Sequence, residues 1–248
     1  MENRPNEKRS ARDDAWAKPV DKFKINNAPA GSIPSTVNGL RLTGPIRGFG
    51  QMWQKTYRAR LGARVKPVEA IRAWKENFPK FWPKGNTFYP SLAGIKPGEI
   101  GLITTSGPGN VPMISTGVMV IYADDESFSF MTPEGHPFAG MVTFSAAEED
   151  GETIAQAQVL IRPNDPIYEL TFRVGIGHKM EDDTWHHTLK SLAAHFNVQT
   201  TVEQKVTLVD PRVQWKEAKN IWHNAGMRTA IYTLMTPARW VRGLFGKK

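Results

Sequence analysis

The chain has 248 residues, of which 40% are hydrophobic and 23% charged, as expected for a globular protein with a full hydrophobic core. It contains no cysteine, which excludes disulfide scaffolds, thiolate-bound zinc and cysteine nucleophiles. The net charge of +8 is unevenly spread, because residues 85–210 carry 6 basic and 16 acidic side chains whereas residues 211–248 carry 8 and 1.

Residues 1–36 contain four prolines, little apolar material and no periodicity. Such a segment buries too little apolar surface to offset the entropy lost on ordering. We therefore predict a disordered or extended N-terminal arm, with Trp16 and Phe23 as its only candidate anchors.

Alternating apolar and polar side chains over residues 52–61 predict a strand, although Lys55 breaks the alternation. Pro67 suits the first turn of a helix, and apolar residues recur after it at helical spacing. Pro79 ends this pattern, which predicts a helix of about three turns.

From Gly98 onward, short β segments are separated by turn residues. The predicted strands are 100–105, 113–122, 127–132, 138–147 and 153–161. Their tight links favour an antiparallel meander, because parallel strands need a longer crossover. Residues 166–174 and 182–196 then predict helices on either side of a kink at Gly175 and Gly177.

This order of elements predicts an α+β protein with a helix-grip fold. In such a fold a curved antiparallel sheet wraps around a long C-terminal helix, here with basic extensions at both ends. We divide the chain into the N-terminal arm (1–36), a helix-grip domain (37–200) and a basic amphipathic helical extension (201–248).

The sequence Phe-Met-Thr-Pro-Glu-Gly-His-Pro at residues 130–137, continuing to Gly140 and Phe144, resembles the hairpin of the domain-of-unknown-function family 1990. That family belongs to the START-like, or SRPBCC, helix-grip superfamily. Pro-Gly-Glu at residues 97–99 and Arg-Pro at residues 162–163 agree with the resemblance.

The resemblance covers roughly residues 50–200 and departs at Met141, where the family usually has a glutamate. It implies a helix-grip fold with an internal cavity. Members of the superfamily commonly bind lipids, polyketides or sterols there. The resemblance implies no particular reaction.

We expect a ligand between the sheet and the long helix, where methionine and aromatic side chains gather. The predicted ligand-binding residues are Met113, Met119, Phe128, Phe130, His136, Phe138, Phe144, His178, Asp182, Trp185 and Leu189. Ordinary core packing is the alternative for each apolar member. For His136 the alternative is a ring hydrogen bond that fixes the hairpin turn.

Polar residues of the predicted helices have competing interpretations. His178, Asp182 and His186 are spaced for a metal, but one helix supplies too few ligands, so we predict neither metal nor cofactor. An ion pair between Arg162 and Asp165 is predicted to anchor the strand-to-helix junction. No catalytic motif assigns an enzymatic role to any of these residues, nor to Tyr168 or His136.

The C-terminal segment combines basic with large apolar residues, and residues 213–235 predict a helix. The predicted membrane or partner contacts are Trp222, Arg228, Arg239, Trp240, Arg242, Leu244 and Phe245. An anionic membrane, a groove on a partner protein and the acidic body of the chain itself would each suit this segment. Dispersed basic groups without a recognition motif argue against nucleic acid.

These features favour non-enzymatic binding of an apolar small molecule, such as a lipid, pigment or polyketide, at a membrane surface or within a complex. Two alternatives stay open. One is an accessory subunit with a packed core that binds partner proteins through its termini, and the other is a cyclase- or hydrolase-type enzyme using the same cavity. Because no segment resembles a secretory signal or a membrane span, we expect a cytoplasmic protein, with peripheral membrane association as a variant.

Overall fold

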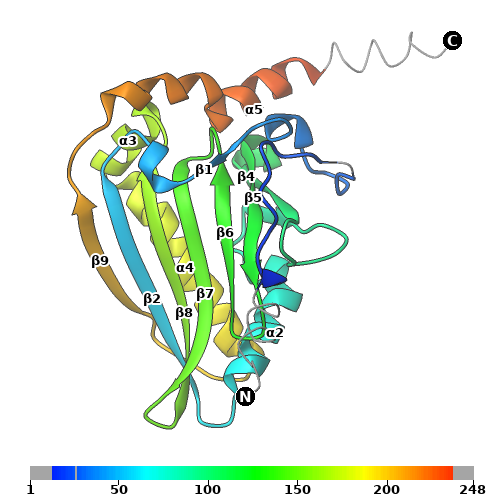
Figure 1. Cartoon of the computed structure of the whole chain (residues 1–248), viewed down its shortest axis with the longest axis vertical. Helices are drawn as coiled ribbons and strands as arrows, with labels where there is room; N and C mark the ends of the chain where they lie inside the picture. Colours follow the sequence, from blue (N-terminus) through cyan, green and yellow to red (C-terminus); the bar gives the residue numbers. More distant parts are fainter. Residues whose placement is uncertain (1–12, 26, 237–248) are drawn as a thin grey trace, which may run out of the picture.

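The computed structural model describes residues 13–25 and 27–236, and within them the strands form one antiparallel sheet (Figure 1). The strands are β1 (Leu42–Thr43), β2 (Met52–Gly62), β3 (Asn86–Tyr89), β4 (Ile100–Ser106), β5 (Pro112–Ala123), β6 (Ser127–Pro133), β7 (Phe138–Glu149), β8 (Glu152–Pro163) and β9 (Glu203–Asp210). Their order across the sheet is β3-β4-β5-β6-β7-β8-β2-β9, and β1 pairs with β6. The predicted meander is confirmed as β4 to β8.

Turn chemistry sets the register of the longest hairpin in the meander. Strands β7 and β8 pair from Phe138 opposite Pro163 to Glu149 opposite Glu152. The two residues between them, Asp150 and Gly151, have φ values of 51° and 78°. Two positive φ angles in a two-residue loop match the right-handed twist of the flanking strands.

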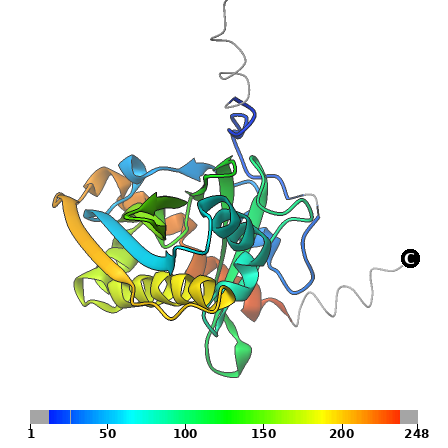
Figure 2. The same cartoon turned by 90° about the horizontal axis from the view of Figure 1, so that it is seen from below.

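The helices lie before, between and after the strands in the sequence. They are η1 (Pro34–Thr36), η2 (Pro45–Arg47), α2 (Pro67–Asn77), η3 (Phe78–Phe81), η4 (Pro108–Asn110), α3 (Pro166–Arg173), α4 (Ile176–His195), η5 (Trp215–His223) and α5 (Ala225–Leu234). Helix α2 contacts β7 and β8, α4 contacts β2 and β8, and the two helices contact each other (Figure 2). Both therefore cover the same face of the curved sheet.

The main hydrophobic core lies between this face and the two helices. Trp74 of α2 is fully buried, with its ring centroid 6.0 Å from that of Phe128 and 5.0 Å from that of Phe144. Phe78 extends the same cluster of edge-to-face rings. Burying each large side chain stabilises the fold by about 1.5–3 kcal/mol.

The N-terminal arm packs on the opposite face of the sheet. Phe23 is fully buried in a small cluster with Leu102 and Met119. Successive residues of a strand point to opposite faces, so Leu102 faces this cluster while Ile103 belongs to the main core. Phe23 is thus an anchor, as predicted, and the Trp16 ring packs against Tyr122 with a centroid distance of 4.8 Å.

The segment after α4 differs from the predicted helical extension. Residues Glu203–Asp210 form the edge strand β9, which pairs antiparallel with β2. Helix α4 has 20 residues but is not the last element, because β9, η5 and α5 follow it. The predicted helix over 213–235 is divided into η5 and α5 at Asn224.

The described part of the C-terminal segment packs on its own domain, across one end of the sheet (Figure 1). The Ser115 amide donates to Thr229 Oγ1 at 2.8 Å, and the Arg228 guanidinium donates to the Ser35 carbonyl at 3.1 Å. The Trp222 side chain is 78% exposed.

The other predicted contact residues, Arg239, Trp240, Arg242, Leu244 and Phe245, lie outside the described residues. Within the described ranges, no helix has both the length and the apolar character needed to cross a membrane.

Candidate ligand-binding cavity

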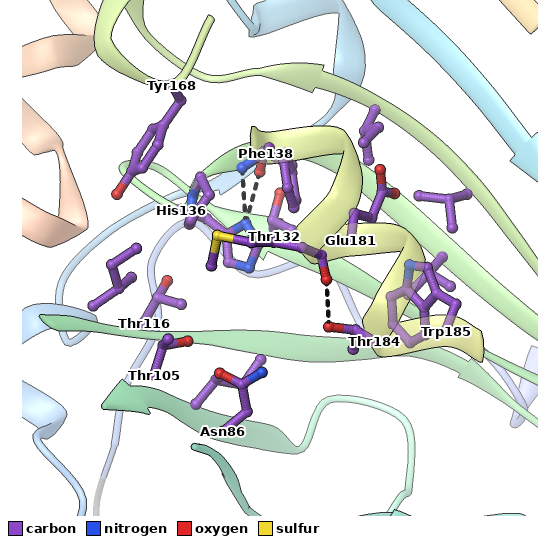
Figure 3. A pocket seen from close by; sticks show the side chains of 18 of the residues that line it. Asn86, Thr105, Thr116, Thr132, His136, Phe138, Tyr168, Glu181, Thr184 and Trp185 are labelled. Carbon is purple, nitrogen blue, oxygen red and sulfur yellow. Dashed lines mark hydrogen bonds between the residues drawn. The ribbon is translucent and has the colours of Figure 1, made fainter. Parts of the chain in front are cut away.

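A cavity of about 400 Å³ lies between the sheet and the junction of α3 with α4 (Figure 3). Strands β4 to β8 supply an apolar wall that includes Ile103, Val118, Phe130, Val142, Val159 and Ile161. Helices α3 and α4 supply the facing wall, which includes Phe172, Met180 and Trp185. Ile176 and Met180 are 55% and 50% exposed, so they mark the side where the cavity reaches the surface.

Two glycines shape the bend between α3 and α4. Gly175 has a φ of 81°, a left-handed conformation that suits glycine. A Cβ at Gly177 would overlap the ring of Phe172, so only glycine lets α4 begin against α3 at this point. The kink predicted at these two residues is therefore confirmed, and it borders the cavity through Gly177.

Four of the eleven predicted ligand-binding residues line the cavity. They are Phe130, His136, Phe138 and Trp185. The first three come from one hairpin, formed by β6, its turn and β7, and the structure brings Trp185 of α4 to them from a distant part of the sequence.

Five other predicted residues do not line the cavity. Phe128, Phe144 and Leu189 are fully buried in the main core, where the core-packing alternative applies to them. Met119 belongs to the small cluster on the opposite face, because it alternates with the cavity-lining Val118. Met113 is 57% exposed at the start of β5.

A buried ionic cluster lies beside the cavity. Lys55 of β2 is fully buried, with its Nζ 2.8 Å from Glu181 Oε2 and 2.7 Å from Asp182 Oδ1. The Tyr57 hydroxyl donates to the same Asp182 oxygen at 2.6 Å. Glu181 lines the cavity, whereas Asp182 lies behind it. Asp182 thus serves the cluster and not the cavity surface.

The two carboxylates of this cluster titrate differently. Burial raises the pKa of Glu181 to about 7 against the lowering effect of Lys55. Burial also opposes ionisation of Asp182, but hydrogen bonds from Lys55 and Tyr57 outweigh it and lower the pKa of Asp182. Lys55 therefore contacts two carboxylates that behave differently. Asp182 stays ionised, whereas Glu181 changes protonation near neutral pH.

This titration predicts a pH-dependent stability. Glu181 has an ordinary pKa of 4.5 and a raised pKa of about 7 in the folded protein. Its stabilising effect is complete below pH 4.5 and is lost as the pH rises through 7. We therefore compare Glu181→Gln, which does not titrate, with the wild type. As the pH rises from 5 to 8, the difference in free energy of unfolding between them should shift in favour of the variant by roughly 2 kcal/mol. Urea unfolding at the two pH values measures this, and a difference independent of pH would contradict it.

The histidines near the cluster have packing roles. The His178 ring contacts Trp53 and Phe172, with centroid distances of 4.8 and 4.4 Å, and does not line the cavity. The His186 ring packs edge-on against Tyr57. Within the described ranges, no three histidine or acidic side chains are grouped as metal ligands.

His136 is held in the hairpin turn by its own neighbours. The Phe138 amide donates to His136 Nδ1 at 3.0 Å, which supports the structural interpretation of this residue. Burial lowers the pKa of His136 to about 4, so its ring is neutral at pH 7. The ring faces the cavity without an acidic partner among the described residues (Figure 3).

The predicted ion pair between Arg162 and Asp165 is wrong. Arg162 pairs with Asp210 and donates to the Gly50 carbonyl at 2.6 Å. Asp165 instead caps α3, accepting hydrogen bonds from the backbone amides of residues 167 and 168. Its other oxygen accepts from Asn224 Nδ2 at 2.8 Å. Arg162 at the end of β8 and Asp165 at the start of α3 thus bind different partners.

Several polar residues of the cavity and its border were not predicted. Lys55 gave a signal, because it interrupts an otherwise regular strand on the inward-facing side. Glu181 and Asn86 gave none, since each stands in an ordinary polar stretch. Asn86 lines the cavity from β3, a strand that was not predicted.

No protein-family model and no curated protein matches the chain, so the resemblance to the domain-of-unknown-function family 1990 is not confirmed. Among solved structures, Ms6760 from Mycobacterium smegmatis is 19% identical over 58% of this chain and 90% of that chain, with a TM-score of 0.40. The di-domain ARO/CYC StfQ from the steffimycin biosynthetic pathway is 11% identical over 59% and 50%, with a TM-score of 0.44. Ara h 8.0201 is 13% identical over 58% and 98%, with a TM-score of 0.40. Similarity at this level carries no conclusion about what this chain binds.

Proposed function

We propose that this chain is a non-enzymatic helix-grip protein that binds an apolar small molecule between its sheet and α4. The cavity of about 400 Å³ carries the proposal, because it lies in a core whose remainder is filled by interlocking aromatic rings. Ligand pockets of roughly 300–1,000 Å³ with mostly apolar walls bury most of a small molecule. The alternative of an accessory subunit requires a packed core at this position and fits the structure less well.

An enzyme using the same cavity is the second candidate, because His136 and Tyr168 both line it. The Tyr168 hydroxyl accepts a hydrogen bond from the Gly226 amide at 3.2 Å. Burial raises the pKa of Tyr168 and lowers that of His136 to about 4. Efficient proton transfer needs groups with a pKa near the working pH, so both shifts favour binding over catalysis.

Filling the cavity tests the proposed function. Val142 is nearly buried on β7 and lines the cavity, so we expect Val142→Trp to occupy the space that a ligand needs. The affinity for N-phenyl-1-naphthylamine, an uncharged fluorescent probe, should fall at least about tenfold, which corresponds to roughly 1.4 kcal/mol. Fluorescence titration measures this.

The matched control is Val206→Trp on β9, where the native side chain is 46% exposed and does not belong to the cavity lining. Its affinity for the probe should equal that of the wild type. Native mass spectrometry of protein isolated from its host gives an independent readout, since a bound apolar molecule should be present in the wild type and lost in Val142→Trp. Equal probe binding by all three proteins would refute a ligand site in this cavity.

A further inference from the structure

Glu181 presents a carboxylate acceptor to a largely apolar space. Its side chain is 2% exposed, and it lines the cavity from the first half of α4 (Figure 3). Lys55 Nζ lies 2.8 Å from Oε2 as an ion pair, but neither carboxylate oxygen has a well-directed hydrogen bond within the described residues. The indole N–H of Trp185 lies close enough to the carboxyl group to lower its pKa, as Lys55 does, but its geometry falls short of a well-directed hydrogen bond.

Buried polar atoms without partners are rare in folded proteins and call for an explanation, such as a missing ligand. Leaving such an atom unsatisfied costs about 1–3 kcal/mol. Asn86 is a second case, because its side chain points into the same space from β3 and its Oδ1 is buried without a partner among the described residues (Figure 3). Both oxygens are acceptors, so a complementary molecule must bring hydrogen-bond donors.

The charges around the cavity restrict what that donor can be. Lys84 is the one lysine or arginine among the described residues of the lining, and its side chain is exposed. A ligand carboxylate inside the cavity would therefore meet Glu181 without a free cation. A ligand ammonium would be repelled by Lys55, which already lies 2.8 Å from that carboxylate. An uncharged hydroxyl group supplies the donor without either conflict.

We propose that the cavity selects an uncharged, largely apolar molecule that carries a hydroxyl group, which donates a hydrogen bond to Glu181. This inference rests on the proposed function and names the class of ligand. Lys55 keeps the acceptor in place by binding its other oxygen, while the aromatic and aliphatic walls hold the remainder of the molecule. Glu181 is thus a specificity-determining residue of the site.

Four probes with one ring system test this proposal by isothermal titration calorimetry at pH 8. They are 2-naphthol, its methyl ether 2-methoxynaphthalene, 2-naphthoate and 2-naphthylmethylammonium. The wild type should bind 2-naphthol about tenfold or more tightly than the ether, because a hydrogen bond to a charged group is worth about 1.5–3 kcal/mol. The two charged probes should bind more weakly than the ether.

Glu181→Leu removes the acceptor, so 2-naphthol should bind it no more tightly than the ether does, while the affinity for the ether stays unchanged. Glu181→Gln keeps an uncharged acceptor and should show an intermediate preference, which carries the test if Glu181→Leu does not fold. The matched control is Glu148→Gln, because Glu148 is an exposed glutamate of β7 outside the lining. The preference of this variant for 2-naphthol over the ether should equal that of the wild type.

The outcomes separate this proposal from the proposed function. If 2-naphthol and the ether bind the wild type equally, the cavity binds apolar molecules but Glu181 does not select a hydroxyl group. A preference that survives in Glu181→Leu, or tighter binding of either charged probe than of 2-naphthol, overturns the proposal in the same way. If no probe binds, the proposed function fails together with this inference.

Discussion

Replacing Lys55 by methionine should lower the free energy of unfolding by about 3–5 kcal/mol at pH 8. The substitution keeps most of the apolar chain but removes the cation that lies within 2.8 Å of two carboxylates. Lys55 lowers the pKa of Glu181, so without it the buried carboxyl must either take up a proton at pH 8 or be ionised without a partner, and both cost stability. Urea unfolding followed by tryptophan fluorescence measures the loss.

The pH and a second substitution identify the cause of this loss. At pH 5 Glu181 is mostly protonated, so the loss caused by Lys55→Met should be smaller. Adding Glu181→Leu should restore part of the stability at pH 8, because it removes the buried carboxyl group that has lost its partner. Lys190→Met on the exposed side of α4 is the control and should change stability by less than about 0.5 kcal/mol. A loss independent of pH and not reduced in the double variant would show that Lys55 acts through packing alone.

Replacing Gly135 by alanine should cost about 2–5 kcal/mol of unfolding free energy. Gly135 has a φ of 79°, so a Cβ is strained there by the backbone conformation. The added carbon would also overlap the carbonyl oxygen of His223, where the C-terminal segment meets the hairpin. Urea unfolding of the purified variant gives the loss.

Gly151→Ala separates the two contributions. Gly151 has nearly the same φ, 78°, but a Cβ there would meet no atom within 4 Å. The free energy of unfolding of Gly151→Ala should therefore fall only by the cost of the backbone conformation, about 1–2 kcal/mol. Equal losses in the two variants would mean that the C-terminal segment does not press against the hairpin.

The meander could be predicted because its strands combine alternating side chains with glycine-containing turns, so local sequence agrees with the final structure. Strand β9 could not be predicted in the same way. It is an edge strand in which both faces are largely exposed, with Leu208 40% and Val209 43% accessible on opposite faces, so alternation carries no information about burial. Strand β3 has only four residues, too few for a periodic signal.

The site was predictable only in part for a related reason. Large apolar residues of a strand were expected to face a ligand, but the same side chains also build the core. Which of them border empty space depends on where α2 and α4 lie, and this is why Phe130 lines the cavity whereas Phe128 does not. The ionic cluster joins residues 127 positions apart, Lys55 and Asp182, a pairing that no local pattern encodes.

The contacts of residues 223–226 also bear on the order in which the molecule assembles. The amide of Ala225 donates to the carbonyl of Gly135 at 2.9 Å, and that of Gly226 donates to the hydroxyl of Tyr168. Residues 223–226 therefore brace the hairpin turn beside the cavity and Tyr168 in its lining. During synthesis the strands of the meander can pair with their neighbours as they emerge, but these contacts can form only after residues 223–226 have been translated.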